Sequence, residues 1–187
     1  MKLGKFFKLG FVPLLTGSLL ATNALAASNG TLGATSTGTV NISITKSMQA
    51  QISDITDMVL ASWNIGDPAV QLYSNLCIYS STGNYKVTAT GSGTSNAFTI
   101  SNGTSTIPYS VVWNSGPAGS LASTGTSLTT NTQSGAFANA SMAAANCGGS
   151  TNDTARVVVN IPQATMQAAP GSATAYTGTL TMLVTPN

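Results

Sequence analysis

The clearest pattern in the chain is an alternation of apolar and polar residues in two segments, 39–46 and 176–185. In 39–46 (TVNISITK), Val40, Ile42 and Ile44 alternate with polar residues, and apolar residues alternate with threonine in much of 176–185 (YTGTLTMLVT). A period of two places the apolar side chains on one face of an extended chain. Both segments are therefore predicted to be strands with one apolar face. The apolar residues of the second segment are Tyr176, Leu180, Met182 and Val184.

Short strands separated by turn residues account for most of the remaining chain. Gly, Pro, Asn and Ser clusters separate them, and 118–153 is small and polar, which predicts long loops with short strands around Leu121 and Phe137. Only the Ala-rich 136–146 favours a turn or two of helix. This pattern predicts one all-β domain, a β-sandwich or alternatively a barrel. The further predicted strands are 57–63, 70–80, 85–90, 97–101, 106–113 and 155–161.

The first 26 residues have the layout of a secretory signal peptide. Three lysines, Lys2, Lys5 and Lys8, precede an apolar run from Leu9 to Leu20, and small residues end at Ala26. The run is too short to span a membrane, and no other apolar run approaches that length. We expect cleavage after Ala26 and a mature protein that is exported and is not integral to a membrane.

Removal of the signal peptide changes the charge balance and leaves little catalytic chemistry. The formal charge of 27–187 is 3 − 4 = −1, which argues against nucleic-acid binding. His and Glu are absent, so neither a Ser-His-Asp triad nor a His-ligated zinc can form. We expect no enzyme activity, metal or cofactor, and we interpret the carboxylates as surface charges. The charged residues of 27–187 are Lys46, Lys86, Arg156, Asp54, Asp57, Asp67 and Asp153.

The chain contains two cysteines, Cys77 and Cys147. An even pair in an exported protein is typically a disulfide. The alternative is a pair of buried free thiols. A catalytic thiol is disfavoured because no His is present to activate it. The predicted disulfide would close a loop of about 70 residues and stabilise the fold by about 4 kcal/mol.

Several motifs together resemble the spore coat protein U domain family, which includes pilin subunits of archaic chaperone–usher pili. The motifs are TVNISIT, VLASWNIG, LCIYSSTGNYKVTATGSG, IPYSVVW and the terminal AYTGTLTMLVTPN. The resemblance covers most of 38–187. Family members usually pair the Cys of the LCIYS strand with a Cys near the end of the first strand. That region reads SMQAQISD here and contains no Cys, so the partner of Cys77 is expected to be Cys147.

The resemblance implies an incomplete immunoglobulin-like β-sandwich that is completed by donor-strand exchange. The donor strand would be Val40, Ile42 and Ile44, on a flexible tail spanning 27–46, followed by the pilin domain at 47–187. The implied partners are a periplasmic chaperone, an outer-membrane usher and identical or related pilin subunits. The implied location is a cell-surface pilus used in attachment or biofilm formation. The acceptor groove would be lined partly by Tyr176, Leu180, Met182 and Val184.

Other interpretations of the same residues stay open at this point. Segment 39–46 is alternatively an ordinary first strand that pairs within its own domain. The whole chain is alternatively a secreted, monomeric carbohydrate-binding β-sandwich with exposed aromatic residues. The third alternative is a hydrolase with an unusual Asp site.

Overall fold

A computed structural model describes residues 27–117 and 119–187. The predicted signal peptide, 1–26, lies outside these residues. The chain divides into two compact units, Met1–Thr45 and Lys46–Asn187. Almost all regular structure in the described residues is β-strand, so the protein is all-β, with antiparallel sheets in the second unit.

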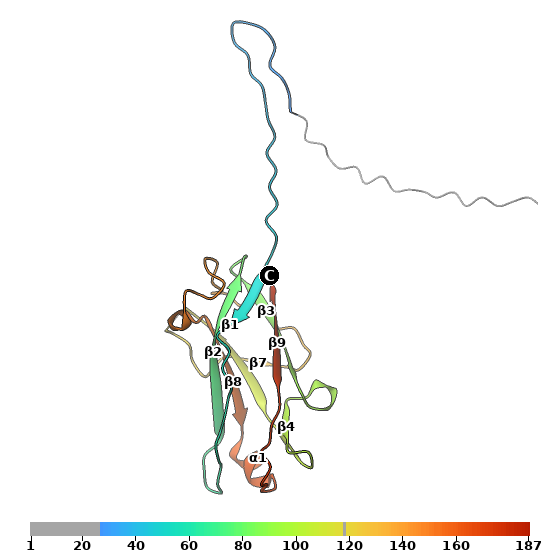
Figure 1. The fold of residues 1–187 in the computed structure, drawn as a ribbon, viewed down its shortest axis with the longest axis vertical. Coiled ribbons are helices and arrows are strands. Elements are labelled where there is room, and N and C mark those ends of the chain that lie inside the picture. Colours follow the sequence, from blue (N-terminus) through green and yellow to red (C-terminus); the bar gives the residue numbers. More distant parts are fainter. Residues whose placement is uncertain (1–26, 118) are drawn as a thin grey trace, which may run out of the picture. The chain divides into compact units, whose positions relative to one another are not determined.

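The largest sheet of the second unit has five strands in the order β1-β2-β8-β6-β7. Every neighbouring pair is antiparallel. Strands β2 and β8 lie side by side through the body of the unit (Figure 1). Both have the predicted bounds, because their β-branched and aromatic residues fit a pleated surface and turns bound them. The strands are β1 (Ala50–Ser53), β2 (Val70–Ser80), β6 (Ser110–Ser115), β7 (Thr126–Leu128) and β8 (Ala155–Ile161).

Two further strand pairs complete the second unit. Strand β3 (Tyr85–Gly91) pairs with β9 (Leu180–Pro186), and β4 (Thr99–Ser101) pairs with β5 (Thr106–Pro108). The helical elements are short. They are η1 (Thr94–Asn96), η2 (Ser150–Asn152) and α1 (Gln163–Ala168).

The main hydrophobic core lies between the five-stranded sheet and the β3–β9 pair. Leu76 of β2 and Val157 of β8 pack in one cluster with Val87 of β3. Trp113 and Tyr85 are also fully buried in it, and the Trp113 ring nitrogen donates a hydrogen bond of 3.1 Å to the Tyr85 hydroxyl. Burial raises the pKa of Tyr85. The hydroxyl is therefore a neutral hydrogen-bonding group inside the core.

Three predicted elements differ from the observed ones, because contacts with distant segments determined which strands and helices formed. Segment 57–63 forms no strand, and the chain from β1 to β2 is irregular. Predicted strand 106–113 is divided at Tyr109, since β5 pairs with β4 whereas β6 joins the large sheet. The Ala-rich 136–146 contains turns and bends rather than a helix.

The 118–153 region and the C-terminal strand also differ in detail. No strand forms around Leu121; the short strand of this region is β7, and Phe137 makes only an isolated bridge to Tyr85. Tyr176 precedes β9 rather than lying in it. Strand β1 and helix α1 are short elements that the hydrophobic pattern does not predict.

The described part of the first unit is 27–45. Ser28 and Thr39 form an isolated antiparallel bridge with two backbone hydrogen bonds of 3.0 Å. No strand is assigned over 40–45, although the sequence predicts one there. An extended segment becomes a strand only when another backbone supplies its hydrogen bonds.

Candidate functional site

The predicted donor residues expose their apolar side chains. The exposed fractions are 74% for Val40, 80% for Ile42 and 87% for Ile44. Side chains of this kind are usually buried, and a run of three exposed ones marks an interaction site or an aggregation hazard. These three residues are therefore exposed apolar positions of the first unit.

Strand β9 is hydrogen-bonded along one edge only. The register places Thr185 opposite Lys86 and Leu183 opposite Thr88, and the Asn187 N–H donates to the Asn84 carbonyl at 3.1 Å. Because backbone groups alternate in direction along an antiparallel strand, those of Met182 and its even-numbered neighbours point away from β3. Within residues 27–117 and 119–187, no backbone hydrogen bond is formed on that outer side of β9.

The core-facing side chains of β9 are not fully covered. Leu180, Met182 and Val184 pack against the main core, yet each is only partly buried. By contrast, their partners Val87 and Ala89 on β3 are fully buried. The core is therefore less well covered at β9 than at β3.

The four residues predicted to line an acceptor surface do not form one group. Leu180, Met182 and Val184 share the core-facing side of β9, whereas Tyr176 packs on a second cluster with Val70 and Ile161. The Tyr176 hydroxyl donates a hydrogen bond of 2.9 Å to the Pro170 carbonyl. Tyr176 therefore belongs to the structure around α1.

Strand β1 lies close to β9 without pairing with it. Its own backbone partners are on β2, where Ala50 lies opposite Ser80 and Ser53 opposite Cys77. Beyond β1, several large apolar side chains of the chain leading to β2 are exposed. They are Ile55, Val59, Leu60 and Ile65. Strand β1 therefore lies near β9, and no strand of the described residues pairs with the outer side of β9.

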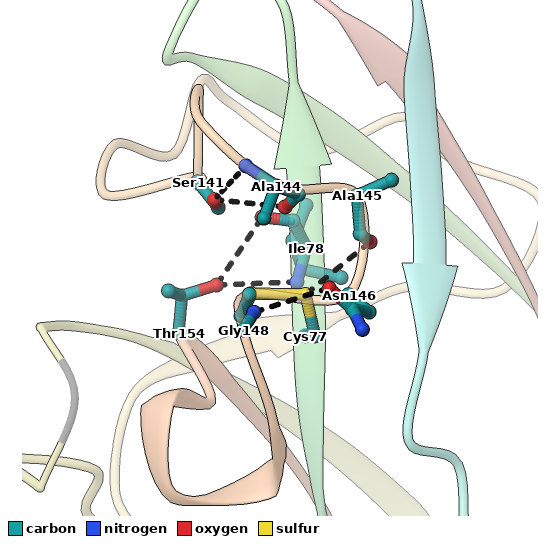
Figure 2. Close-up of a disulfide and its surroundings, with 9 residues drawn as sticks. Cys77, Ile78, Ser141, Ala144, Ala145, Asn146, Gly148 and Thr154 are labelled. Atoms are coloured by element: carbon teal, nitrogen blue, oxygen red, sulfur yellow. Dashed lines mark hydrogen bonds between the residues drawn. A yellow bond between two sulfur atoms is a disulfide. The ribbon is translucent and has the colours of Figure 1, made fainter.

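A disulfide joins Cys77 of β2 to Cys147, with a Cα–Cα distance of 5.7 Å and a sequence separation of 70. This is the pair that the sequence predicts. Figure 2 shows the loop that carries Ala144, Ala145 and Asn146 folded beside β2 at Cys77 and Ile78. Thr154 holds the far end of this loop, because its hydroxyl lies 3.2 Å from the Ile78 N–H and accepts its hydrogen bond.

Two open hollows occur on the second unit. One open hollow of about 650 Å³ lies between β5 and α1, and a second of about 440 Å³ lies beside Gln49, Tyr79 and Ala145. Neither hollow includes the exposed triplet or β9. Within 27–117 and 119–187, no three His, Cys, Asp or Glu residues gather in a possible metal site, and no helix is long and apolar enough to cross a membrane.

One buried carboxyl group was missed by sequence analysis. Asp153, interpreted as a surface charge, is only 6% exposed, and Asp54 lies beside it. Neither the composition nor the spacing of these residues, about 100 positions apart, indicates this contact.

A scan against protein-family models finds no match. A search of curated proteins finds no significant match. The resemblance to the spore coat protein U domain family therefore rests on the sequence motifs.

Proposed function

We propose that this protein is a structural subunit of a surface pilus, assembled when the 40–44 segment of one subunit pairs with the outer edge of β9 in another. The observation that carries the proposal is the exposed triplet Val40, Ile42 and Ile44 in a chain whose β9 has an unpaired edge. Addition of an extended segment to a free edge satisfies backbone groups, and alternate side chains enter the neighbouring core.

The donor segment 40–44 and the outer edge of β9 match in length. The outer edge of β9 offers the backbone groups of Leu180, Met182 and Val184, ending at Pro186, which has no N–H to donate. The donor segment carries three apolar side chains with the same spacing of two residues. Burial of three such side chains stabilises an assembly by roughly 1.5–3 kcal/mol each before ordering costs.

The core-facing side chains of β9 are only partly buried. This supports a pairing in which the donor side chains enter the core, in addition to backbone hydrogen bonds along the edge of β9. A donor side chain that enters beside Met182 covers apolar surface that the subunit itself leaves uncovered. A slip of one residue would instead direct Ser43 toward the core, so the register of pairing is strict. We further propose a periplasmic chaperone that covers this edge before assembly, an outer-membrane usher, and attachment or biofilm formation as the use of the fibre.

The decisive experiment compares Ile42→Asp with Ser43→Asp in the exported chain. Both variants add one negative charge to the same segment, but on opposite faces of the extended chain. Ile42→Asp should abolish polymers, because a carboxylate cannot enter an apolar core without a large desolvation cost. Ser43→Asp should leave polymers largely intact.

A mixing step separates loss of donation from loss of folding. Tagged Ile42→Asp subunits, mixed with wild-type subunits during assembly, should still accept a wild-type donor and copurify at one end of short oligomers. Size analysis after affinity capture measures this outcome. Equal polymerisation of Ile42→Asp and wild type, or a wild-type chain that stays monomeric throughout, would contradict the proposal.

A further inference from the structure

The outer face of the five-stranded sheet carries an exposed aromatic ring beside an arginine. Leu76 of β2 and Val157 of β8 belong to the main core. Because side chains alternate between the two faces of a strand, Tyr73 and Asn75 of β2 and Arg156 of β8 lie on the opposite, outer face. The Tyr73 side chain is 53% exposed there.

Two neighbours on this face fix the position of the Arg156 guanidinium. The Arg156 Nε donates a hydrogen bond of 2.8 Å to the Asn75 side-chain oxygen. The central carbon of the guanidinium lies 4.3 Å from the centre of the Tyr73 ring, where the ring attracts a cation. Arg156 therefore presents a positive charge in a defined orientation on the surface of the sheet.

This arginine has no ion-pair partner in the part of the chain that the structure describes. No described carboxylate lies within ion-pair distance of Arg156, and its two terminal NH₂ groups form no hydrogen bond with a described residue. A guanidinium binds a carboxylate through two parallel N–H···O bonds, and an oriented guanidinium loses less freedom in doing so. The arrangement is therefore suited to the carboxylate of a ligand.

Neutral amide groups lie on the same face. Gln71 of β2 lies opposite Asn160 of β8, and its side-chain nitrogen donates a hydrogen bond of 3.0 Å to the Asn160 side-chain oxygen. Gln71 is two residues from Tyr73, or about 7 Å along the strand. Amides both donate and accept hydrogen bonds, as binding of sugar hydroxyl groups requires. A single cation among neutral groups suits a ligand with one charge per unit, whereas a polyphosphate calls for several cations.

We propose that this face binds a chain of uronic acid sugars. The carboxylate of one sugar pairs with Arg156, an apolar side of a sugar ring packs on the exposed part of Tyr73, and the amides of Gln71 and Asn160 bind hydroxyl groups. The face is formed by β2 and β8 and includes neither 40–44 nor β9. The inference therefore does not depend on the pilus proposal.

The test compares two ligands on the wild-type chain comprising 27–187, using saturation-transfer NMR detected on the ligand. The ligands are trigalacturonate and its methyl ester, which has the same sugar rings without the charges. The ester should bind at least about tenfold more weakly, because it cannot form the charged pair with Arg156. Equal binding of the two ligands, or no binding of trigalacturonate, would overturn the proposal. This comparison does not depend on a variant that folds.

Variants then locate the site. Arg156→Gln should weaken trigalacturonate binding to the level of the ester, and Arg156→Lys should restore only part of it, because an ammonium lacks the planar pair of donors. Tyr73→Ala should weaken binding by about threefold or more, whereas Tyr73→Phe should bind as wild type does. Lys86→Gln removes a different cation, on β3, and should leave binding unchanged. Equal losses in Lys86→Gln and Arg156→Gln would overturn the proposal, since they would indicate general attraction between charges.

Discussion

Two segments with the same alternation of apolar and polar residues reach opposite states in this protein. Segment 40–44 forms no strand and exposes its three apolar side chains. Strand β9 instead pairs with β3 and turns Leu180, Met182 and Val184 toward the core. The difference lies in the partner, because β3 supplies both hydrogen bonds and an apolar neighbour. Alternation therefore encodes a one-faced strand without specifying which backbone will pair with it.

The comparison also shows that, among the described residues, β9 has a strand partner on only one of its two edges. Its inner edge is bonded to β3 and its outer edge is not, and its core-facing side chains stay partly exposed. A free apolar edge is a liability that proteins normally cover. In the proposed assembly, the exposed segment and the outer edge of β9 supply the two halves of one strand pairing.

The largest expected effect is a loss of stability in the second unit that leaves strand donation by 40–44 unchanged. Replacing both cysteines by alanine, Cys77→Ala with Cys147→Ala, should lower the free energy of unfolding by about 4 kcal/mol, because the loop of about 70 residues gains entropy when unfolded. Urea unfolding of a chain comprising 27–187 measures this loss. The same variant, when folded at low temperature, should still donate its 40–44 segment. A midpoint equal to that of the oxidised wild type would contradict the prediction.

A matched pair of substitutions, one in β9 and one in 40–44, tests whether the two segments contribute differently to the stability of the subunit. Met182→Asp places a carboxylate against the core and should destabilise the unassembled subunit by about 3 kcal/mol. Ile42→Asp should change the stability of the same subunit by less than about 0.5 kcal/mol, since Ile42 is exposed. Denaturant unfolding of dilute monomers compares the two. Equal destabilisation would show that 40–44 packs within its own domain, as an ordinary first strand does.

The smallest effect lies in the exchange of single amide hydrogens along β9. In the monomer, Thr181, Leu183 and Thr185 should exchange slowly because their N–H groups bond to β3, whereas Met182 and Val184 should exchange quickly. On assembly, the amides of Met182 and Val184 should slow by about tenfold or more. Residue-resolved hydrogen exchange before and after assembly measures this change. Uniform protection along β9 in the monomer would show that its outer edge is already covered.

The local pattern of apolar and turn residues correctly predicts the strands that lie in the buried core. The bounds of β2 and β8 follow from apolar, β-branched runs bounded by turn residues, and β3 extends one residue beyond its prediction. These strands lie at the centre of the core, where burial and pattern agree. The cysteine pair was also predictable from the sequence, because two cysteines offer only one pairing within the chain.

Tertiary structure decided the features that depend on distant neighbours. The division of 106–113 at Tyr109 arises because two sheets compete for one apolar run, and the irregular 54–69 reflects the absence of a strand partner along it. The burial of Asp153 beside Asp54 is likewise invisible in a sequence where the two lie far apart. The sequence by itself determined an all-β protein with one cysteine pair and two one-faced terminal segments. Which edges are paired and which carboxyl is buried was decided only in three dimensions, because hydrogen bonding and desolvation depend on what lies next to each group in space.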